Sequence, residues 1–320
     1  MKGAKFIRDW MLIFSMLTGA GAYVLYRCLP FLHPAGPLLL KSVKTIQPLL
    51  LFLMLFLSFC KIEPRSMKPH RWMGWLLLVQ CLSFLLFSLP LIFCPGLNPD
   101  LALFLESLML CFICPTATAC AVVTGKLGGN MAGVVTYTVL INMAAAVLVP
   151  AVVPLVHPAE GLPFATAFSL IMAKVFPLLI MPCLLAWVVR FLLPGLHARI
   201  LKFTDLSFYI WALSLSLAIL MSARSIYISG AGALSLIAIA AGSLLACVVQ
   251  FALGRKIGGK YRCPISAGQA LGQKNTVFAI WMGYTFMTPV TSLAGGFYSI
   301  WHNVWNSWQL AHATKDKIRQ

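Results

Sequence analysis

Charged side chains are scarce in this sequence, and acidic ones are the scarcest. The 320 residues include seven Asp and Glu against 24 Lys and Arg, and only 10% of the chain is charged, whereas 61% is hydrophobic. The mean hydropathy is +0.91. A soluble domain of this length carries about 25% charged residues to cover its surface. The composition therefore excludes a soluble fold and predicts an all-α polytopic membrane protein.

Several catalytic and nucleotide-binding motifs are also missing. The sequence has no GxxxxGK[ST] loop, which argues against an ATP-driven pump within the chain, and no HExxH or GxSxG motif. The ten cysteines show no metal-ligand spacing and fall mostly in apolar stretches, so we interpret them as packing residues. We expect no catalytic residues, no metal site and no enzyme activity. A transporter is the favoured class, and a channel or sensor and an intramembrane enzyme are the alternatives.

Apolar stretches long enough to cross a bilayer, about 20 residues each, recur along the chain. We place ten of them, at 10–29, 38–60, 72–94, 101–125, 130–156, 164–193, 206–222, 230–253, 263–284 and 288–310. If the N-terminus is cytoplasmic, 18 of the 24 basic residues fall in cytoplasmic loops and termini. This distribution follows the positive-inside rule. It predicts a plasma (inner) membrane protein with both termini in the cytoplasm, and it gives no reason to expect a nucleic-acid partner.

A short internal repeat suggests how the spans are organised. Tyr137, Thr138 and Asn142 in the fifth span recur, 161 positions later, as Tyr298, Ser299 and Asn303 in the tenth. Since each half then has five spans, an odd number, residues 1–157 and 158–320 would have opposite orientations in the membrane. Such inverted repeats are typical of secondary transporters, whose substrates bind near the midplane where interrupted helices meet.

Two spans carry polar interruptions at membrane depth. In the fourth span, Pro115 removes a backbone donor within the stretch 114–120. In the ninth, the polar stretch 267–276 contains Lys274, and a lysine at mid-bilayer costs about 2.5–3.5 kcal/mol unless it faces a cavity or a partner. We expect both spans to be broken helices. A simple proline kink is the alternative for the fourth.

The candidate site follows from these interruptions and the facing spans. The candidate substrate- or ion-binding residues are Pro115, Thr116, Thr118, Cys120, Thr124, Asn130, Thr138, Asn142, Gln269, Gly272, Gln273, Lys274, Asn275, Thr276, Ser299 and Asn303. Asn142 and Asn303 are each expected to point at the crossover. Glu106 is the acid best placed within a span, and we predict that it forms a structural or gating pair with Lys174.

Short motifs at these positions resemble the bile acid:sodium symporter superfamily. They are Cys114-Pro115 with Thr124, the Gly129-Asn130 turn, and Gly272, Asn275 and Ala279 of the ninth span. The resemblance implies ten helices in two inverted five-helix repeats, with spans four and nine unwound and crossing. It also implies a panel domain (spans 1, 2, 6 and 7) and a core domain (spans 3–5 and 8–10). Separately, we expect a monomer or weak homo-oligomer. The implied substrates are small organic anions: bile acids, pantothenate or keto acids.

The sequence departs from this superfamily where sodium would bind. The family's acidic residue and glutamine of span nine are replaced by Ala270 and Lys274, and its serine-asparagine pair of span four by Cys120 and Ala121. Sodium needs several hard oxygen ligands. We hypothesise that Lys274 replaces sodium as a tethered cation and that the protein needs no cofactor. Release and uptake of a proton by Lys274 would give proton-linked transport. Ordinary sodium symport through amide and carbonyl oxygens, or a permanently paired structural lysine, remain alternatives.

Overall fold

A computed structural model describes residues 11–94, 96–158, 161–203 and 206–318. This part of the chain is helical and contains no strand. The elements are α2 (Met11–Cys28), η1 (Pro30–Ala35), α3 (Gly36–Cys60), η2 (Pro64–Ser66), α4 (Arg71–Phe93), α5 (Pro99–Ile113), α6 (Cys120–Lys126), α7 (Met131–Val156), α8 (Phe164–Leu192), α9 (Pro194–Lys202), α10 (Leu206–Ser229), α11 (Ala233–Gly259), α12 (Pro264–Gly272), α13 (Thr276–Phe286) and α14 (Leu293–Ile318). Both termini, which we predict to be cytoplasmic, lie outside the described residues.

Six helical segments of the described chain are long and apolar enough to cross a membrane. They are Pro30–Cys60, Arg71–Phe93, Met131–Val156, Phe164–Leu192, Leu206–Ile228 and Ala233–Gly259. The other four predicted spans correspond to α2, to the pair α5 and α6, to the pair α12 and α13, and to α14. The last span starts later than predicted, at Leu293 instead of residue 288, because residues 287–292 form a turn that contains Pro289.

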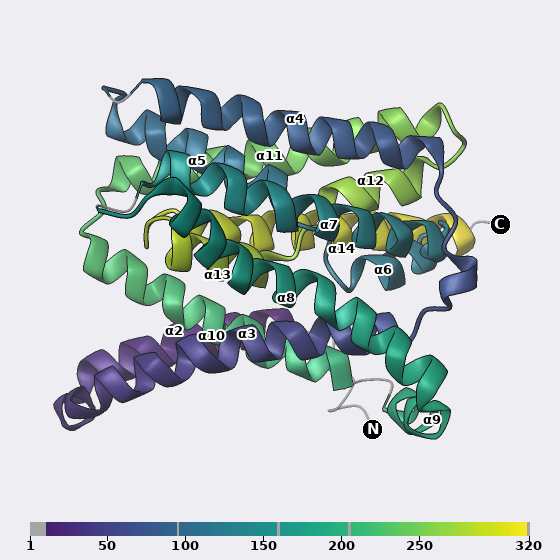
Figure 1. Ribbon diagram of the computed structural model, residues 1–320, viewed down its shortest axis with the longest axis horizontal. Coiled ribbons are helices and arrows are strands. Elements are labelled where there is room, and N and C mark those ends of the chain that lie inside the picture. Colours follow the sequence, from purple (N-terminus) through teal and green to yellow (C-terminus); the bar gives the residue numbers. More distant parts are fainter. Residues whose placement is uncertain (1–10, 95, 159–160, 204–205, 319–320) are drawn as a thin grey trace.

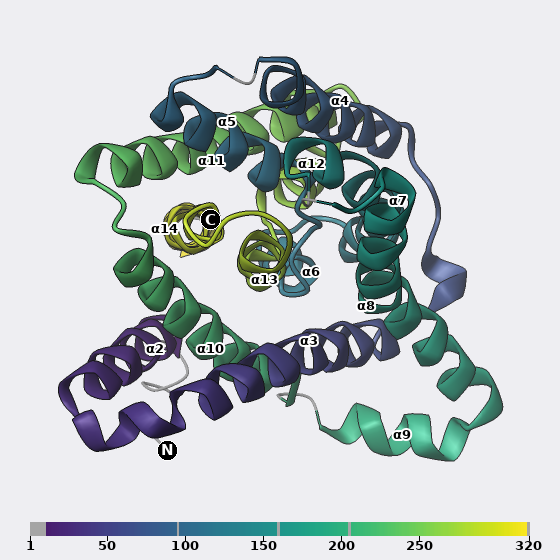
Figure 2. The ribbon, with the colours of Figure 1, turned by 60° about the vertical axis from the view of Figure 1, so that its left-hand side comes forward.

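The long helices form two groups. In Figures 1 and 2, α2, α3 and α10 lie side by side, and α8 continues this group through its packing against α3. The helices α4, α5, α7, α11 and α12 form the opposite part of the molecule, and α6, α13 and α14 lie between the two groups (Figure 2). The pairs α11–α12, α11–α5 and α4–α5 pack closely within the second part. The sites described below lie within this second part and between it and α3 and α8.

Close backbone contact between α11 and α12 depends on a glycine. A Cβ at Gly254 of α11 would lie 2.6 Å from the carbonyl oxygen of Ala267 in α12, closer than such atoms approach in proteins. Glycine lets two helix backbones approach each other without a side chain between them. Gly254 therefore allows α12 to lie directly on α11, which fixes where the chain after α12 enters the interior.

The fourth and ninth spans are each interrupted, and their interruptions meet. Helix α5 ends at Ile113 and α6 begins at Cys120, while α12 ends at Gly272 and α13 begins at Thr276. Thr116 and Lys274 form an isolated antiparallel bridge, and the backbone N–H groups of Ala117 and Asn275 donate to the carbonyls of Gln273 and Pro115, at 2.9 and 2.8 Å. A proline kink within one continuous helix is therefore wrong for the fourth span. The unwound backbone of each span satisfies polar groups of the other, as membrane depth requires.

Candidate functional site

Lys274 lies in the interior at the crossing of the two interrupted spans. Its side chain is 1% exposed, and its ammonium donates to the carbonyl oxygen of Phe112 at 3.4 Å. Phe112 belongs to the last turn of α5, where carbonyl groups lack helical partners and the helix dipole is negative. The backbone N–H of Lys274 donates to Nδ1 of His302 in α14, at 3.4 Å. Lys274 thus places its side-chain amino group against the C-terminal end of a broken helix.

Two glutamines bind the neighbouring carbonyl groups. Gln80 of α4 donates to the carbonyl of Cys114 at 2.9 Å and accepts from the Tyr137 hydroxyl at 2.7 Å. Gln250 of α11 donates to the carbonyl of Cys111 at 3.3 Å and to the Tyr298 hydroxyl at 3.2 Å. The end of α5 is therefore held by one ammonium and two amides.

These two glutamines were not among the predicted site residues, although the sequence holds a signal for them. Gln80 and Gln250 are single amides inside otherwise apolar stretches, and both are completely buried. A polar group at membrane depth is costly unless it is hydrogen-bonded, so an isolated amide in a span indicates a buried partner. The repeat that we identified from Tyr137 and Tyr298 marks the two positions that these glutamines contact.

The end of α12 is held in a related way. The Thr116 hydroxyl donates to the carbonyl of Ala270 at 2.7 Å, and the Tyr298 hydroxyl donates to the carbonyl of Gly272 at 2.7 Å. Gly272 has no room for a side chain, because a Cβ would lie 2.4 Å from the Phe251 ring. The crossing is thus a closely packed unit in which several candidate residues contact one another.

Other candidate residues position the helices around the crossing. The side chain of Asn275 caps α13 by accepting from the N–H of Phe278. The backbone carbonyl of Asn275 accepts from the Cys114 thiol at 2.9 Å. Asn130 caps α7 in the same manner through the N–H of Gly133. The remaining candidates near the crossing are buried: Cys120, Thr124 and Thr276.

The side chains of three further candidates bind groups outside the crossing. Asn142 donates to the carbonyl of Leu179 in α8, so the expectation that it points at the crossover is wrong. Asn303 donates to the carbonyl of Ser299 at 2.7 Å, so its amide is bound within its own helix. Gln269 of α12 donates to Oδ1 of Asn306 at 3.0 Å and to Oε1 of Gln309 at 2.8 Å, both in α14.

The predicted pairing of Glu106 with Lys174 is also wrong. Glu106 accepts from the Thr291 hydroxyl, and its carboxylate lies 3.5 Å from Nε2 of His157, a contact that is an ion pair when His157 is protonated. Lys174 lies instead with its ammonium 5.7 Å from the centroid of the Phe286 ring. Sequence position gave both residues a similar depth, but they face different neighbours. Among the described residues, no group of three His, Cys, Asp or Glu side chains is placed to hold a metal ion.

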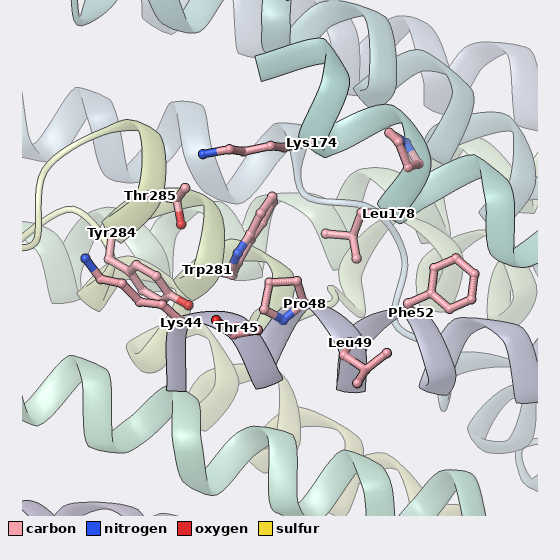
Figure 3. A pocket seen from close by; sticks show the side chains of 11 residues that line it. Lys44, Thr45, Pro48, Leu49, Phe52, Lys174, Leu178, Trp281, Tyr284 and Thr285 are labelled. Atoms are coloured by element: carbon pink, nitrogen blue, oxygen red, sulfur yellow. The ribbon is translucent and has the colours of Figure 1, made fainter. Parts of the chain in front are cut away.

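Two cavities lie between the α3–α8 group and the crossing spans. The larger, about 650 Å³, is bordered by α3, α8 and α13, and Figure 3 shows Lys44, Lys174, Trp281 and Tyr284 around it. The smaller, about 20 Å³, is lined by residues of α3 and of the core, Thr118 and Thr138 among them. The candidates Thr118 and Thr138 therefore line the smaller cavity, and Lys44, which lines the larger one, was not among the predicted site residues.

The chain is similar to a known family of membrane proteins. The model of the Sodium Bile acid symporter family matches residues 48–230, which is more than half of the chain. The match includes α5 and α6, whereas α12, α13 and Lys274 lie beyond it. No match was found among curated proteins. The family match confirms the resemblance seen in the motifs: the chain belongs to the sodium bile acid symporter family.

Proposed function

We propose that the protein is a secondary active transporter that moves small organic anions across the membrane by alternating access, with the Lys274 ammonium in place of a coupling sodium ion. Membership of the family makes it a multi-pass membrane protein of a transporter class, not of an enzyme class, that works in a lipid bilayer on a small molecule. The observation that carries the finer proposal is the contact between the Lys274 ammonium and the carbonyl of Phe112. It provides a fixed cation where two broken helices meet.

The proposed architecture is ten spans in two inverted five-helix repeats, residues 1–157 and 158–320. It is supported by the two interruptions and by the two Gln–Tyr pairs, Gln80 with Tyr137 and Gln250 with Tyr298, which use the third and fifth spans of each half. The panel domain would be α2, α3, α8 and α10, which pack consecutively on one another. The remaining spans would form the core domain.

The proposed orientation places the basic ends of the helices in the cytoplasm, at the inner membrane. Figure 1 shows α9, the α11–α12 connection and the C-terminal part of α14 at one end of the molecule. These segments include Arg199 and Lys202 of α9 and Lys256 at the end of α11. Cytoplasmic segments near membrane spans are enriched in such residues.

The two cavities support an outward-facing state under this orientation. The large cavity includes Lys44, in the half of α3 that would be outer, whereas the small one includes Ser58, near the cytoplasmic end of α3. We propose that the substrate enters the large cavity, and that movement of the core against the panel closes it and opens the small one. The substrate would be a bile-acid-like, pantothenate-like or keto-acid anion.

Ordinary sodium symport is the second candidate. It is favoured by the family's name and by two buried amide oxygens, Oε1 of Gln269 and Oε1 of Gln273, that have no hydrogen-bond partner among the described residues. Against it, an ammonium in this proposal already contacts the carbonyl of Phe112 at the end of α5, and a nearby positive charge repels a sodium ion.

Uptake by the purified protein in proteoliposomes decides between the two candidates. Taurocholate, pantothenate and pyruvate would be offered in sodium and in choline buffers at equal ionic strength. We expect saturable uptake and counterflow of at least one anion, at the same rate in both buffers. A steep, saturable dependence on sodium would establish the second candidate. Uptake that neither saturates nor shows counterflow would indicate a channel.

A further inference from the structure

The charged residues that line the cavity between α3, α8 and α13 are all basic. Two of its lining residues are lysines, Lys44 from α3 and Lys174 from α8, and none is an acid. Figure 3 shows the two side chains on different walls, with Trp281 and Thr285 of α13 between them. A cleft lined by charges of one sign, with apolar walls, concentrates ions of the opposite sign.

Neither lysine has an acidic partner in the described part of the chain. The one contact of salt-bridge length found there joins His157 and Glu106, and the contact found for Lys174 is the ring of Phe286. A monoanion in the cavity would neutralise one ammonium and leave the other without a counter-charge. A ligand with two anionic groups would neutralise both.

The wall between the lysines carries two aromatic rings that are held in place. Trp281 is buried and packs edge-on against Phe286, with ring centroids 5.3 Å apart and an interplanar angle of 88°. The hydroxyl of Tyr284 donates to Oε1 of Gln47 at 2.9 Å, which fixes that ring as well. Fixed aromatic rings favour an apolar or aromatic ligand segment lying on them.

We infer that this cavity selects organic dianions, in which an apolar or aromatic segment separates two anionic groups and each group pairs with Lys44 or Lys174. The volume of about 650 Å³ falls within the roughly 300–1,000 Å³ usual for organic ligands. The inference rests on the proposed function, because it names the substrate class of the proposed transport site, but it is tested by binding, which does not depend on transport.

The test compares dianions with matched monoanions on the purified protein. The probes are terephthalate against benzoate, and the dicarboxylates from succinate to sebacate, each against the monocarboxylate of equal chain length. Affinity is measured by calorimetry and by ligand-induced thermal stabilisation at fixed ionic strength. At least one dianion should bind about tenfold or more tightly than its monoanion, the effect of one additional charge pair worth about 1.4 kcal/mol.

Three variants show which residues produce the difference in affinity between a dianion and its monoanion. Lys44→Met and Lys174→Met should each weaken binding of the preferred dianion about tenfold or more, while the matched monoanion should lose affinity in at most one of them. Lys41→Met is the control, because Lys41 is exposed and lies one helical turn before Lys44 but does not line the cavity. It removes the same charge from the same helix and should leave both affinities unchanged.

The outcomes separate this inference from the transport proposal. If no dianion in the set binds more tightly than its monoanion, or if Lys41→Met weakens binding as much as Lys44→Met, the dianion inference is overturned. Saturable uptake of monoanions without any dianion preference would overturn it and leave the transport proposal standing. Selective dianion binding without uptake in any vesicle assay would support it and contradict the transport proposal.

Discussion

Replacement of Lys274 by glutamine tests whether its charge serves transport or folding. Removing one partner of a buried ion pair typically costs about 3–5 kcal/mol, because it leaves an uncompensated charge. That cost does not apply here: the group found at the Lys274 ammonium is the carbonyl of Phe112, 3.4 Å away, and not a carboxylate. The relevant loss is one charge-assisted hydrogen bond, about 1.5–3 kcal/mol.

The substitution also removes an unfavourable term from the free energy of folding, which opposes the loss of the hydrogen bond. The Lys274 side chain is 1% exposed, so the wild-type protein bears the desolvation cost of an ammonium, which amounts to several kcal/mol in proteins. A glutamine at this position removes that cost and retains an N–H donor. We therefore expect the free energy of unfolding of Lys274→Gln to lie within about 2 kcal/mol of the wild-type value, or above it, while uptake is lost.

The assays are thermal unfolding of the purified variant and uptake in proteoliposomes. Lys274→Gln should unfold near the wild-type temperature and lose most of its uptake. Lys274→Arg should keep a cation at the crossing but bind differently, because a guanidinium is larger and remains protonated at all accessible pH values. If the wild-type cycle involves release of a proton by Lys274, the Arg variant should bind substrate without pH-driven accumulation.

Two results would refute this reasoning. Uptake by Lys274→Gln with an unchanged rate and pH profile would mean that Lys274 is only a tolerated polar residue and does not replace a coupling ion. A variant that fails to fold, while Lys274→Arg folds normally, would mean that the positive charge is needed for the structure itself. In that case the small stability change derived from the Phe112 contact is wrong.

Three further predictions concern topology, packing and coupling. A membrane-impermeant maleimide should label the exposed thiol of Cys94 from outside intact cells, and labelling only after the membrane is opened would reverse the orientation. Gly254→Ala should lower the free energy of unfolding by about 1–3 kcal/mol through overpacking against α12. Gly259→Ala should be tolerated, because an added Cβ there meets no atom within 4 Å. Equal thermal stability of the two variants would contradict this prediction. The double variant Ala270→Glu with Lys274→Gln restores the residues usual in the family and should make substrate binding depend on sodium. Calorimetry with and without sodium measures this dependence. Equal substrate affinities in the two buffers would show that more sodium ligands are missing.

The sequence predicted where the helices lie better than what they contact. All ten predicted spans overlap a helix or a helix pair, because the length of apolar stretches follows directly from bilayer thickness. The interruptions were equally predictable from the sequence, since Pro115 and the polar residues around Lys274 are locally unfavourable in a continuous apolar helix. The bridge between Thr116 and Lys274 was not readable, because it depends on how two segments 158 positions apart meet in space.

Failed side-chain predictions share a physical cause. Hydropathy and helical spacing give the depth of a residue and the face of the helix on which it lies, but neighbouring helices and lipid are similarly apolar and do not identify that face's partner. Asn142 was on a polar face, yet the face meets α8 and not the crossing. Glu106 had the depth to reach Lys174, yet it contacts Thr291 and His157. The second error matters for function: since Glu106 is engaged elsewhere, Lys174 keeps its charge uncompensated among the described residues. That charge, together with Lys44, makes the cavity suited to anions.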